Sequence, residues 1–437
     1  MKQYKVNTLG CFLARIYSVL FWDEFHYPQP IKGRYDVTGS LKEKLKWVYK
    51  IWIKQLEVAE KGSGIEAYFA AQDLRFSPPE GFEREAALSL SAGGDLMAVD
   101  VLTEANTPNL FDDIRDFYFG ADITCANLES TVYTAAPLGR NSIPNMPAKM
   151  NTSEGMLDRF LAGGAGIDYF STANNHSYDY GEAGLLATLD ILEQKGCWFS
   201  GTNRTPEQQE DVLIVEKNGI KTAFLAYTFD MNGNQYEKKH LINEVRFNDE
   251  TVDISLVRRH IQRAKEKGAD LIVASCHWGW EFEMYPHKNI MEVAHLLAEE
   301  GVDVILGGHP HVAQPMERYT AKGDGRQCLI IYSLGDFVSY HPLTPNSKLT
   351  YVVRFQVEKG TLRGTGHTCI TQLEVLPVYI AAGEKADGTC DFRLLQFEKV
   401  LMSPGHYALT EGERRDLPRL DQALLRGIIL PRGWEHR

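Results

Sequence analysis

The spacing of apolar and polar positions divides the chain into a helical start and a longer region of alternating strands and helices. Residues 41–60 carry apolar side chains at helical spacing with charged residues between them, which predicts an amphipathic helix. Pro78, Pro79 and Gly81 then interrupt the pattern. Because such residues end regular structure, we place a domain boundary near residue 85.

Short apolar runs and helical segments alternate beyond this boundary. Strands are predicted at residues 88–95, 121–129, 166–176, 270–279, 302–311 and 328–337. Helices are predicted at residues 182–195, 252–268, 288–300 and 418–427. Residues 211–228 have the pattern of a hairpin that turns at Asn218 and Gly219, and the segments after 345 resemble antiparallel strands. This order is typical of an α/β protein with a β-rich second half.

Length and composition extend this picture. The chain has 437 residues, of which 44% are apolar, so it can form a large core and exceeds one typical domain. We expect a helical extension over residues 1–85 and a main domain over residues 86–380. A tail over residues 381–437 is expected to pack on that domain.

Net charge and cysteine usage exclude some classes of protein. The charge of −12 disfavours nucleic acid as a partner, because an acidic chain repels phosphate backbones. An anionic substrate would need nearby metals or a few arginines. The seven cysteines form no C-x-x-C pair, and their odd number favours reduced thiols in a reducing compartment.

The N-terminal region contains an apolar run at residues 10–22 that Arg15 interrupts. The run is far too short to span a bilayer, so we expect no transmembrane anchor here. No small-residue cleavage site follows it, which disfavours a signal peptide. We expect an amphipathic or docking helix in a cytoplasmic protein, with membrane association as the less favoured alternative.

Potential metal ligands and acid–base residues follow most of the predicted strands. They are Asp95, Glu129, Asn174, Asn175, His176, His277, Glu281, His309, His311 and Asp336. Any one alone would be an ordinary turn residue. Ligand sites of α/β sheets lie at the carboxyl ends of strands, so the succession predicts one common site. Carboxylate, amide and imidazole together suit manganese, iron or zinc, and no cysteine indicates a closed structural zinc site.

The most informative element is Gly308-His309-Pro310-His311. Residues i and i+2 on an extended backbone point to the same side, so two imidazoles could reach two adjacent ions. The glycines before them let the backbone approach closely. The alternative is an exposed loop with two incidental histidines.

The chain resembles the poly-γ-glutamate capsule-synthesis (CapA-like) proteins in its motif series GGD, ANLE, NNHSYDYG, HWGWE, GGHPHVAQPME and YSLGDF. The resemblance covers roughly residues 88–345. That family belongs to the calcineurin-like metallophosphoesterase superfamily. The resemblance therefore implies an α/β fold with four layers, an α/β/β/α sandwich of two mixed sheets, following the N-terminal helical extension.

The resemblance also implies a site for two divalent transition-metal ions. Asp95 would bind the first ion, Glu129 would bridge both, and Asn175 would bind the second. His277 and His309 would complete the second ion, and His311 the first. The leaving-group acid would be His176. Four further residues match family motifs and would contact substrate or orient the ligands: Asn174, Asp179, Glu281 and Asp336.

Two positions depart from the family patterns. Met97 stands where the superfamily commonly has a ligating histidine, which the CapA-like branch usually lacks, so we expect the first ion to bind more weakly. The motif SLGDF, with Asp336, replaces the more usual SLGNF and changes the charge beside the site. Arg140, in the predicted loop after Glu129, is a candidate contact for a substrate phosphate or carboxylate. The alternative is a solvated loop arginine.

The function implied is a metal-dependent hydrolase of the metallophosphoesterase type that cleaves a phosphoester or related bond with metal-activated hydroxide. Two alternatives stay open: a poly-γ-glutamate synthesis or processing factor, and a non-catalytic binding subunit that kept the fold. The expected partner is a small anionic substrate or polyglutamate. Neither the fold nor the expected metals determine the substrate. The oligomeric state does not follow from the sequence.

Overall fold

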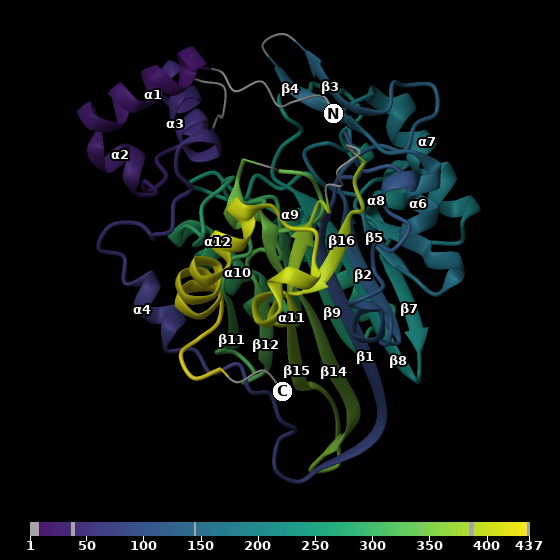
Figure 1. Cartoon of the computed structure of the whole chain (residues 1–437). Helices are drawn as coiled ribbons and strands as arrows, with labels where there is room; N and C mark the ends of the chain where they lie inside the picture. Colours follow the sequence, from purple (N-terminus) through teal and green to yellow (C-terminus); the bar gives the residue numbers. More distant parts are fainter. Residues whose placement is uncertain (1–7, 36–39, 144–145, 342, 384–388, 435–437) are drawn as a thin grey trace.

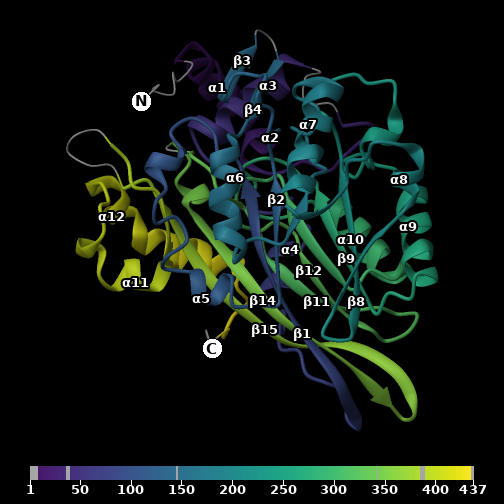
Figure 2. The same cartoon turned by 90° about the vertical axis from the view of Figure 1, so that its right-hand side faces the viewer.

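The computed structural model describes residues 8–35, 40–143, 146–341, 343–383 and 389–434. Two mixed β-sheets pack against each other, and helices flank them (Figures 1 and 2). The contact between the sheets is apolar: Tyr169 of one sheet stacks on Phe224 of the other, with ring centroids 4.3 Å apart. The predicted fold class, with two mixed sheets and helices at the N-terminus, is confirmed.

The first sheet has the strand order β16-β15-β14-β1-β2-β5-β6, and β13 pairs with β1. Its bounds are β1 Phe82–Leu96, β2 Ile123–Leu128, β5 Tyr169–Ser171, β6 Trp198–Ser200, β13 Asp336–Val338, β14 Leu349–Leu362, β15 Thr365–Ala381 and β16 Arg393–Gln396. Strands β1, β2, β5 and β6 run parallel, whereas β14, β15 and β16 join in antiparallel order. The expected antiparallel strands after residue 345 are therefore present.

The second sheet has the strand order β11-β12-β10-β9-β8-β7. Its bounds are β7 Leu213–Lys217, β8 Ile220–Thr228, β9 Leu271–His277, β10 Val304–Gly308, β11 Met316–Thr320 and β12 Gln327–Ile331. Every residue of β9 and β10 is buried, which explains why these central strands are almost continuously apolar in sequence. The hairpin predicted at residues 211–228 is confirmed as β7 and β8.

The helices cover the outer faces of the sheets and build the N-terminal region (Figures 1 and 2). Those of the N-terminal region are α1 Thr8–Leu20, α2 Trp22–His26, α3 Leu41–Trp52 and α4 Ile65–Ala70. Those of the main body are α5 Arg115–Tyr118, α6 Glu154–Leu161, α7 Gly181–Gln194, α8 Pro206–Glu210, α9 Ser255–Glu266 and α10 Lys288–Glu300. The C-terminal helices are α11 Phe397–Met402, α12 Glu411–Arg419 and a π-helical segment Leu420–Ile429. Among the described residues, none of the helices combines the length and the apolar character needed to cross a bilayer.

Two local expectations need correction. Helix α3 ends at Trp52, well before residue 60, where the predicted helix ended. Residues 328–337 are not one strand: β12 ends at Ile331, the chain bends through Gly335 at φ +76°, and β13 starts at Asp336. The domain boundaries at residues 85 and 380 stay predictions.

Candidate metal centre

The strand ends of the two sheets meet at one edge of the molecule. Asp95 on β1 lies beside Asn127 on β2 and Asp336 on β13, while His277 at the end of β9 lies beside Gly308 on β10. A Cβ atom added to Gly308 would lie only 2.6 Å from Asp95 Oδ1. The absence of a side chain at Gly308 therefore permits the close approach of the two sheets at this point.

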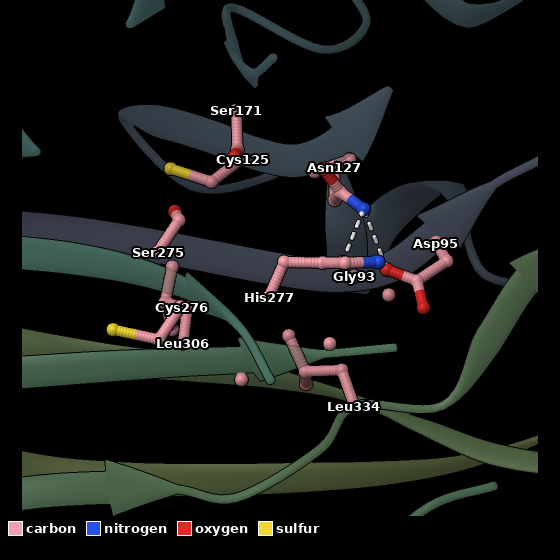
Figure 3. A pocket seen from close by; sticks show the side chains of 14 residues that line it. Gly93, Asp95, Cys125, Asn127, Ser171, Ser275, Cys276, His277, Leu306 and Leu334 are labelled. Atoms are coloured by element: carbon pink, nitrogen blue, oxygen red, sulfur yellow. Dashed lines mark hydrogen bonds between the residues drawn. The ribbon is translucent and has the colours of Figure 1, made fainter. Parts of the chain in front are cut away.

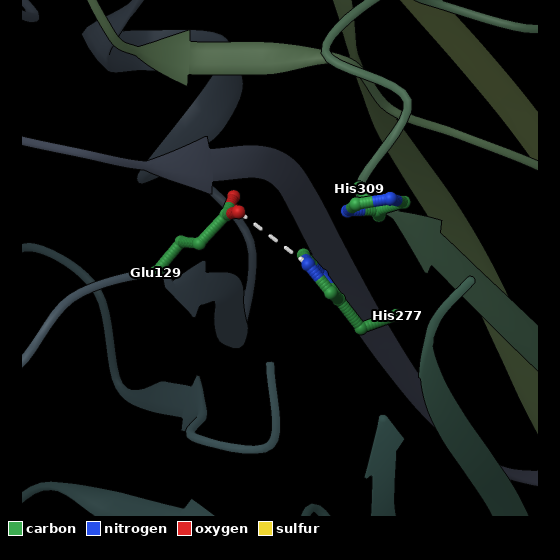
Figure 4. A group of neighbouring side chains, drawn as sticks. All are labelled: Glu129, His277 and His309. Atoms are coloured by element: carbon green, nitrogen blue, oxygen red, sulfur yellow. Dashed lines mark ion pairs between the residues drawn. The ribbon is translucent and has the colours of Figure 1, made fainter. Parts of the chain in front are cut away.

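Metal-donor atoms gather there in four overlapping groups of described residues, each with its donor atoms within 4.8 Å of one another. The groups are Glu129–His277–His309, Asp95–Glu129–His311, Glu281–His309–His311 and His311–Asp336–His341. Figure 4 shows the first group, with His277 directed at the Glu129 carboxylate. Glu129 and His311 recur among the groups, so the donors form one connected cluster.

Glu129 is fully buried, and neither carboxylate oxygen has a hydrogen-bond partner among the described residues. Its Oε1 atom lies 3.4 Å from His277 Nε2 and 3.9 Å from His311 Nε2. His309 Nδ1 is likewise buried without a hydrogen-bond partner in the described chain. Leaving such groups unpaired is costly, and a divalent cation would satisfy them. The residues present therefore fit a metal centre.

The protonation of these side chains follows from their burial. Burial, together with the negative charges of Asp95 and Asp336, raises the pKa of Glu129 well above its ordinary value. Burial also lowers the pKa values of His277 and His309 well below the ordinary range, and the neighbouring imidazoles add to this effect. Both rings are therefore neutral at pH 7, which is the form that binds metals.

Asparagine side chains join the strand ends beneath the cluster. His277 Nε2 donates a hydrogen bond to Asn175 Oδ1 over 2.9 Å, so both atoms are directed at the same place. Asn127 Nδ2 donates to Asp95 Oδ1 over 2.8 Å and lies 3.4 Å from His277 Nδ1 (Figure 3). Asn174 Nδ2 donates to the Leu128 carbonyl over 2.7 Å. Asn174 thus fixes the turn after β5 against the end of β2.

His176 is held by Asp179. His176 Nδ1 donates to Asp179 Oδ2 over 2.7 Å, and that oxygen also accepts from the backbone N–H of Met150 over 2.6 Å. Both side chains are buried. Because Nδ1 carries the hydrogen in this pair, Nε2 is the atom left to exchange a proton with another group.

His311 and Asp336 form a second histidine–carboxylate pair. His311 Nδ1 donates to Asp336 Oδ1 over 3.0 Å, and His341 Nε2 lies 3.5 Å from Asp336 Oδ2. Burial opposes protonation of His311, but the negative charge and hydrogen bond of Asp336 outweigh it and raise the pKa of His311 to about 9. His311 is therefore an imidazolium at neutral pH when no cation lies beside it.

The backbone of the Gly-His-Pro-His element differs from the expectation. His309 has φ +96° and His311 has φ +55°, so both occupy the left-handed region instead of extended backbone. The extended geometry predicted for these residues is wrong, because the chain turns immediately after β10. The imidazoles still converge, with ring centroids 6.0 Å apart. Left-handed conformations of non-glycine residues cost free energy and gather at functional sites.

Glu281 and Arg140 lie at the periphery of the cluster. Glu281 shares a donor group with His309 and His311, and its carboxylate accepts a hydrogen bond from the Trp47 indole N–H. Arg140 is on a strand, β3 (Gly139–Ile143), which pairs with β4 (Met146–Asn151). Its side chain is only 17% exposed and pairs with Asp100 over 3.2 Å, so the alternative of a solvated loop arginine is wrong.

A pocket continues from the cluster into the space between the sheets. It begins at Asp95, Asn127 and His277 and is lined farther from them by small and apolar residues that include Cys125, Cys276 and Leu306 (Figure 3). Small side chains at this level leave room below the polar cluster. They also keep its lower side free of further charge.

Three residues of the cluster and its surroundings were not predicted from the sequence as site residues. Asn127 was a detectable candidate, because it stands in the same strand-end motif as Glu129. His341 follows Asp336 closely in sequence, and a search for histidines after the last motif would have found it. Asn232, which accepts a hydrogen bond from Asn175 over 3.2 Å, carries no sequence signal, because it lies in a loop after β8.

The family comparison agrees with this geometry. Residues 89–341 match the sequence model of a family described as bacterial capsule synthesis protein PGA_cap. The match spans every strand-end residue from Asp95 to Asp336. It ends at His341 and excludes helices α1 to α4.

Curated relatives extend the comparison. The PGA biosynthesis protein CapA of Bacillus subtilis (strain 168) is 26% identical over 293 residues, covering 66% of this chain and 72% of that protein. The capsule biosynthesis protein CapA of Bacillus anthracis is 26% identical over 306 residues, 68% of each chain. A 2',3'-cyclic-nucleotide 2'-phosphodiesterase/3'-nucleotidase of Salmonella typhimurium is 24% identical over 246 residues, 53% of this chain and 34% of that enzyme. This distant similarity supports the superfamily to which the motifs pointed.

Proposed function

Because this chain belongs to the bacterial capsule synthesis protein PGA_cap family, we propose that it acts in the synthesis or processing of poly-γ-glutamate through a metal-dependent hydrolytic site. The observation that carries the proposal is the buried Glu129 carboxylate, which has no hydrogen-bond partner among the described residues and faces two imidazoles. The family match and the CapA relatives favour the capsule context over a free-standing small-molecule phosphoesterase.

Two divalent ions, manganese, iron or zinc, would occupy the cluster. Asp95, Glu129 and His311 would hold one, and Glu129, Asn175, His277 and His309 the other. When bound, such ions supply Lewis-acid chemistry and lower the pKa of water from about 15.7 to roughly 7. Gly308 of β10 and the small residues of the pocket leave room for these side chains to converge.

The chain's own residues would do the remaining work. Asp179 orients His176, whose Nε2 atom would deliver a proton to the leaving group. Asp336 orients His311 through Nδ1, leaving Nε2 directed toward Glu129. Arg140 would attract an anionic substrate group, since its guanidinium stays charged although burial lowers its pKa to about 10.

A second candidate function is phosphoester hydrolysis on a small molecule, which the similarity to the cyclic-nucleotide phosphodiesterase supports. A substrate panel separates the two. The protein is supplied with Mn²⁺, Zn²⁺ or Fe²⁺ and offered γ-linked polyglutamate, a nitrophenyl phosphate and cyclic nucleotides.

Shortening of the polymer, with little turnover of the phosphoesters, is the result expected. Turnover of phosphoesters alone would favour the second candidate. No turnover of any substrate by metal-loaded protein would contradict both and favour a binding subunit.

A further inference from the structure

The N-terminal helices lie outside the matched residues 89–341, yet they reach the cluster. Helix α3 lies beside the strand-end edge (Figure 1). Its Trp47 donates its indole N–H to Glu281 Oε2. Glu281 in turn forms, with His309 and His311, one of the four groups of potential metal ligands.

The same region ties down the residues that follow Glu281. Lys50 of α3 pairs with Glu283 over 2.8 Å, and the two side chains are only 11% and 6% exposed. Just after α3, the Leu56 N–H donates to the Phe282 carbonyl over 3.0 Å, and Met284 N–H donates to the Leu56 carbonyl over 2.8 Å. Further along, Glu60 accepts the Lys288 N–H over 2.8 Å. Side-chain and backbone contacts thus hold residues 281–288 from one side.

The opposite side of this segment rests on the histidine loop. Phe282 N–H donates to the Pro310 carbonyl over 2.8 Å, and the Phe282 ring lies 5.9 Å from the ring of His311. Phe282 has φ +62°, a left-handed conformation that persists only where surrounding contacts impose it. Residues 281–284 are therefore fixed between the N-terminal region and the loop that carries His309 and His311.

We propose that the N-terminal region helps to build the metal centre. Trp47 is a positioning residue, which holds the Glu281 carboxylate where it can bind a metal ion beside His309 and His311. This inference rests on the proposed metal site. Glu281 would be an additional metal ligand in a cluster that has Met97 at the position where the superfamily commonly has a ligating histidine. The 1%-exposed Met97 side chain packs with Val99 and Met150 and is in none of the donor groups.

The chain offers a matched control for Trp47. Trp52 lies on the same helix, its ring contacts Trp47 at 5.8 Å, and its buried indole N–H has no hydrogen-bond partner among the described residues. Replacing either tryptophan by phenylalanine removes similar apolar area. Trp47→Phe alone removes a hydrogen bond to the cluster.

The first experiment follows the indole N–H resonances of the metal-free, full-length protein by NMR. Trp47→Phe and Trp52→Phe identify the two signals. We expect Glu281→Gln to shift the Trp47 signal and to leave the Trp52 signal in place. An unshifted Trp47 signal would overturn the contact.

The second experiment measures Mn²⁺ affinity by calorimetry. Residues that orient metal ligands contribute about 10–100-fold to affinity, so Trp47→Phe should weaken binding by about tenfold and Trp52→Phe by less than about twofold. Adding Trp47→Phe to Glu281→Gln should cause no further loss, whereas a purely structural role for Trp47 would add one.

The outcomes separate this inference from the proposed function. Wild-type protein that binds no ion would refute the metal site itself. Wild-type protein that binds Mn²⁺, with Trp47→Phe binding equally well, would leave the metal site standing and overturn the role of Trp47.

Discussion

The two halves of the cluster differ in how many of their potential metal-binding atoms already have a hydrogen-bond partner in the protein. In the half formed by Glu129, His277 and His309, both Glu129 oxygens and His309 Nδ1 have no hydrogen-bond partner among the described residues. In the half around Asp95 and His311, the Asp95 carboxylate is already engaged in hydrogen bonds. Asp95 accepts hydrogen bonds from Asn127 over 2.8 Å and from the His309 N–H over 3.0 Å.

If two ions bind as proposed, this difference predicts unequal affinities for them. A donor without a protein partner gains its full interaction from a cation, whereas a hydrogen-bonded carboxylate gains less. The half around Asp95 must also displace the proton of His311. We therefore expect the half around His277 to bind its ion more tightly.

Removing the shared carboxylate should break both halves at once. Glu129→Gln takes away the proposed bridging ligand, so both ions should bind more than about 100-fold more weakly, beyond the loss usual for groups that only orient ligands. Turnover should fall to background. Elemental analysis after Mn²⁺ reconstitution checks the metal content, and thermal unfolding of the metal-free variant checks that it is folded. Retention of both ions would refute a bridging role.

His176→Asn should separate proton transfer from metal binding. His176 is in none of the donor groups, so Mn²⁺ affinity should stay close to that of the wild type. Turnover should fall by about 10²–10⁴-fold, the usual contribution of general acid–base catalysis. The loss should shrink for substrates with good leaving groups. Kinetics with good and poor leaving groups check this, and equal losses for both would contradict the assigned role.

Changing the pH should sharpen the difference between the halves. Because the pKa of His311 is raised to about 9 in the metal-free protein, an ion on the Asp95 side must displace a proton below that pH. Its affinity should rise by up to about tenfold per pH unit more than that of the other ion as the pH increases from 7 to 9. Calorimetric titrations at pH 7 and pH 9 measure the ratio. In His311→Gln that extra pH dependence should disappear.

The smallest effect is expected at Met97. Its thioether packs with Val99 and Met150 and belongs to none of the donor groups, so Met97→Leu should change metal affinity and turnover by less than about twofold. Titration with Mn²⁺ under identical conditions provides the check. A loss of one ion would show that the sulfur is a ligand.

The position of the cluster could be predicted because it depends on strand order and little else. Neighbouring parallel strands end at the same edge, so Asp95 and Glu129 come together in the first sheet, as do His277 and His309 in the second. The packing of the two sheets then joins the two pairs. The hairpin at Asn218 and Gly219 was equally predictable, since its turn is set by local chemistry. Each strand end and the hairpin turn can be recognised from a few neighbouring residues of the sequence.

Features set by distant contacts could not be predicted. The left-handed backbone of His309 and His311 depends on the turn after β10, and histidine as a residue type does not predict a positive φ. Trp47 reaches Glu281 across 234 positions of the sequence, which no local pattern encodes. The bend before Asp336 was missed because only Ser333 interrupts the apolar run 328–334, although Gly335 turns the chain directly after it.

The most direct test of the account is a calorimetric titration of carefully demetallated wild-type protein with Mn²⁺, followed by stepwise chelation and elemental analysis. We predict two ions of unequal affinity, with the weaker one lost first on mild chelation and activity lost with it. Addition of Mn²⁺ should restore both. Two equally tight ions would contradict the proposed difference between the halves, and no bound ion after reconstitution would contradict the metal centre itself.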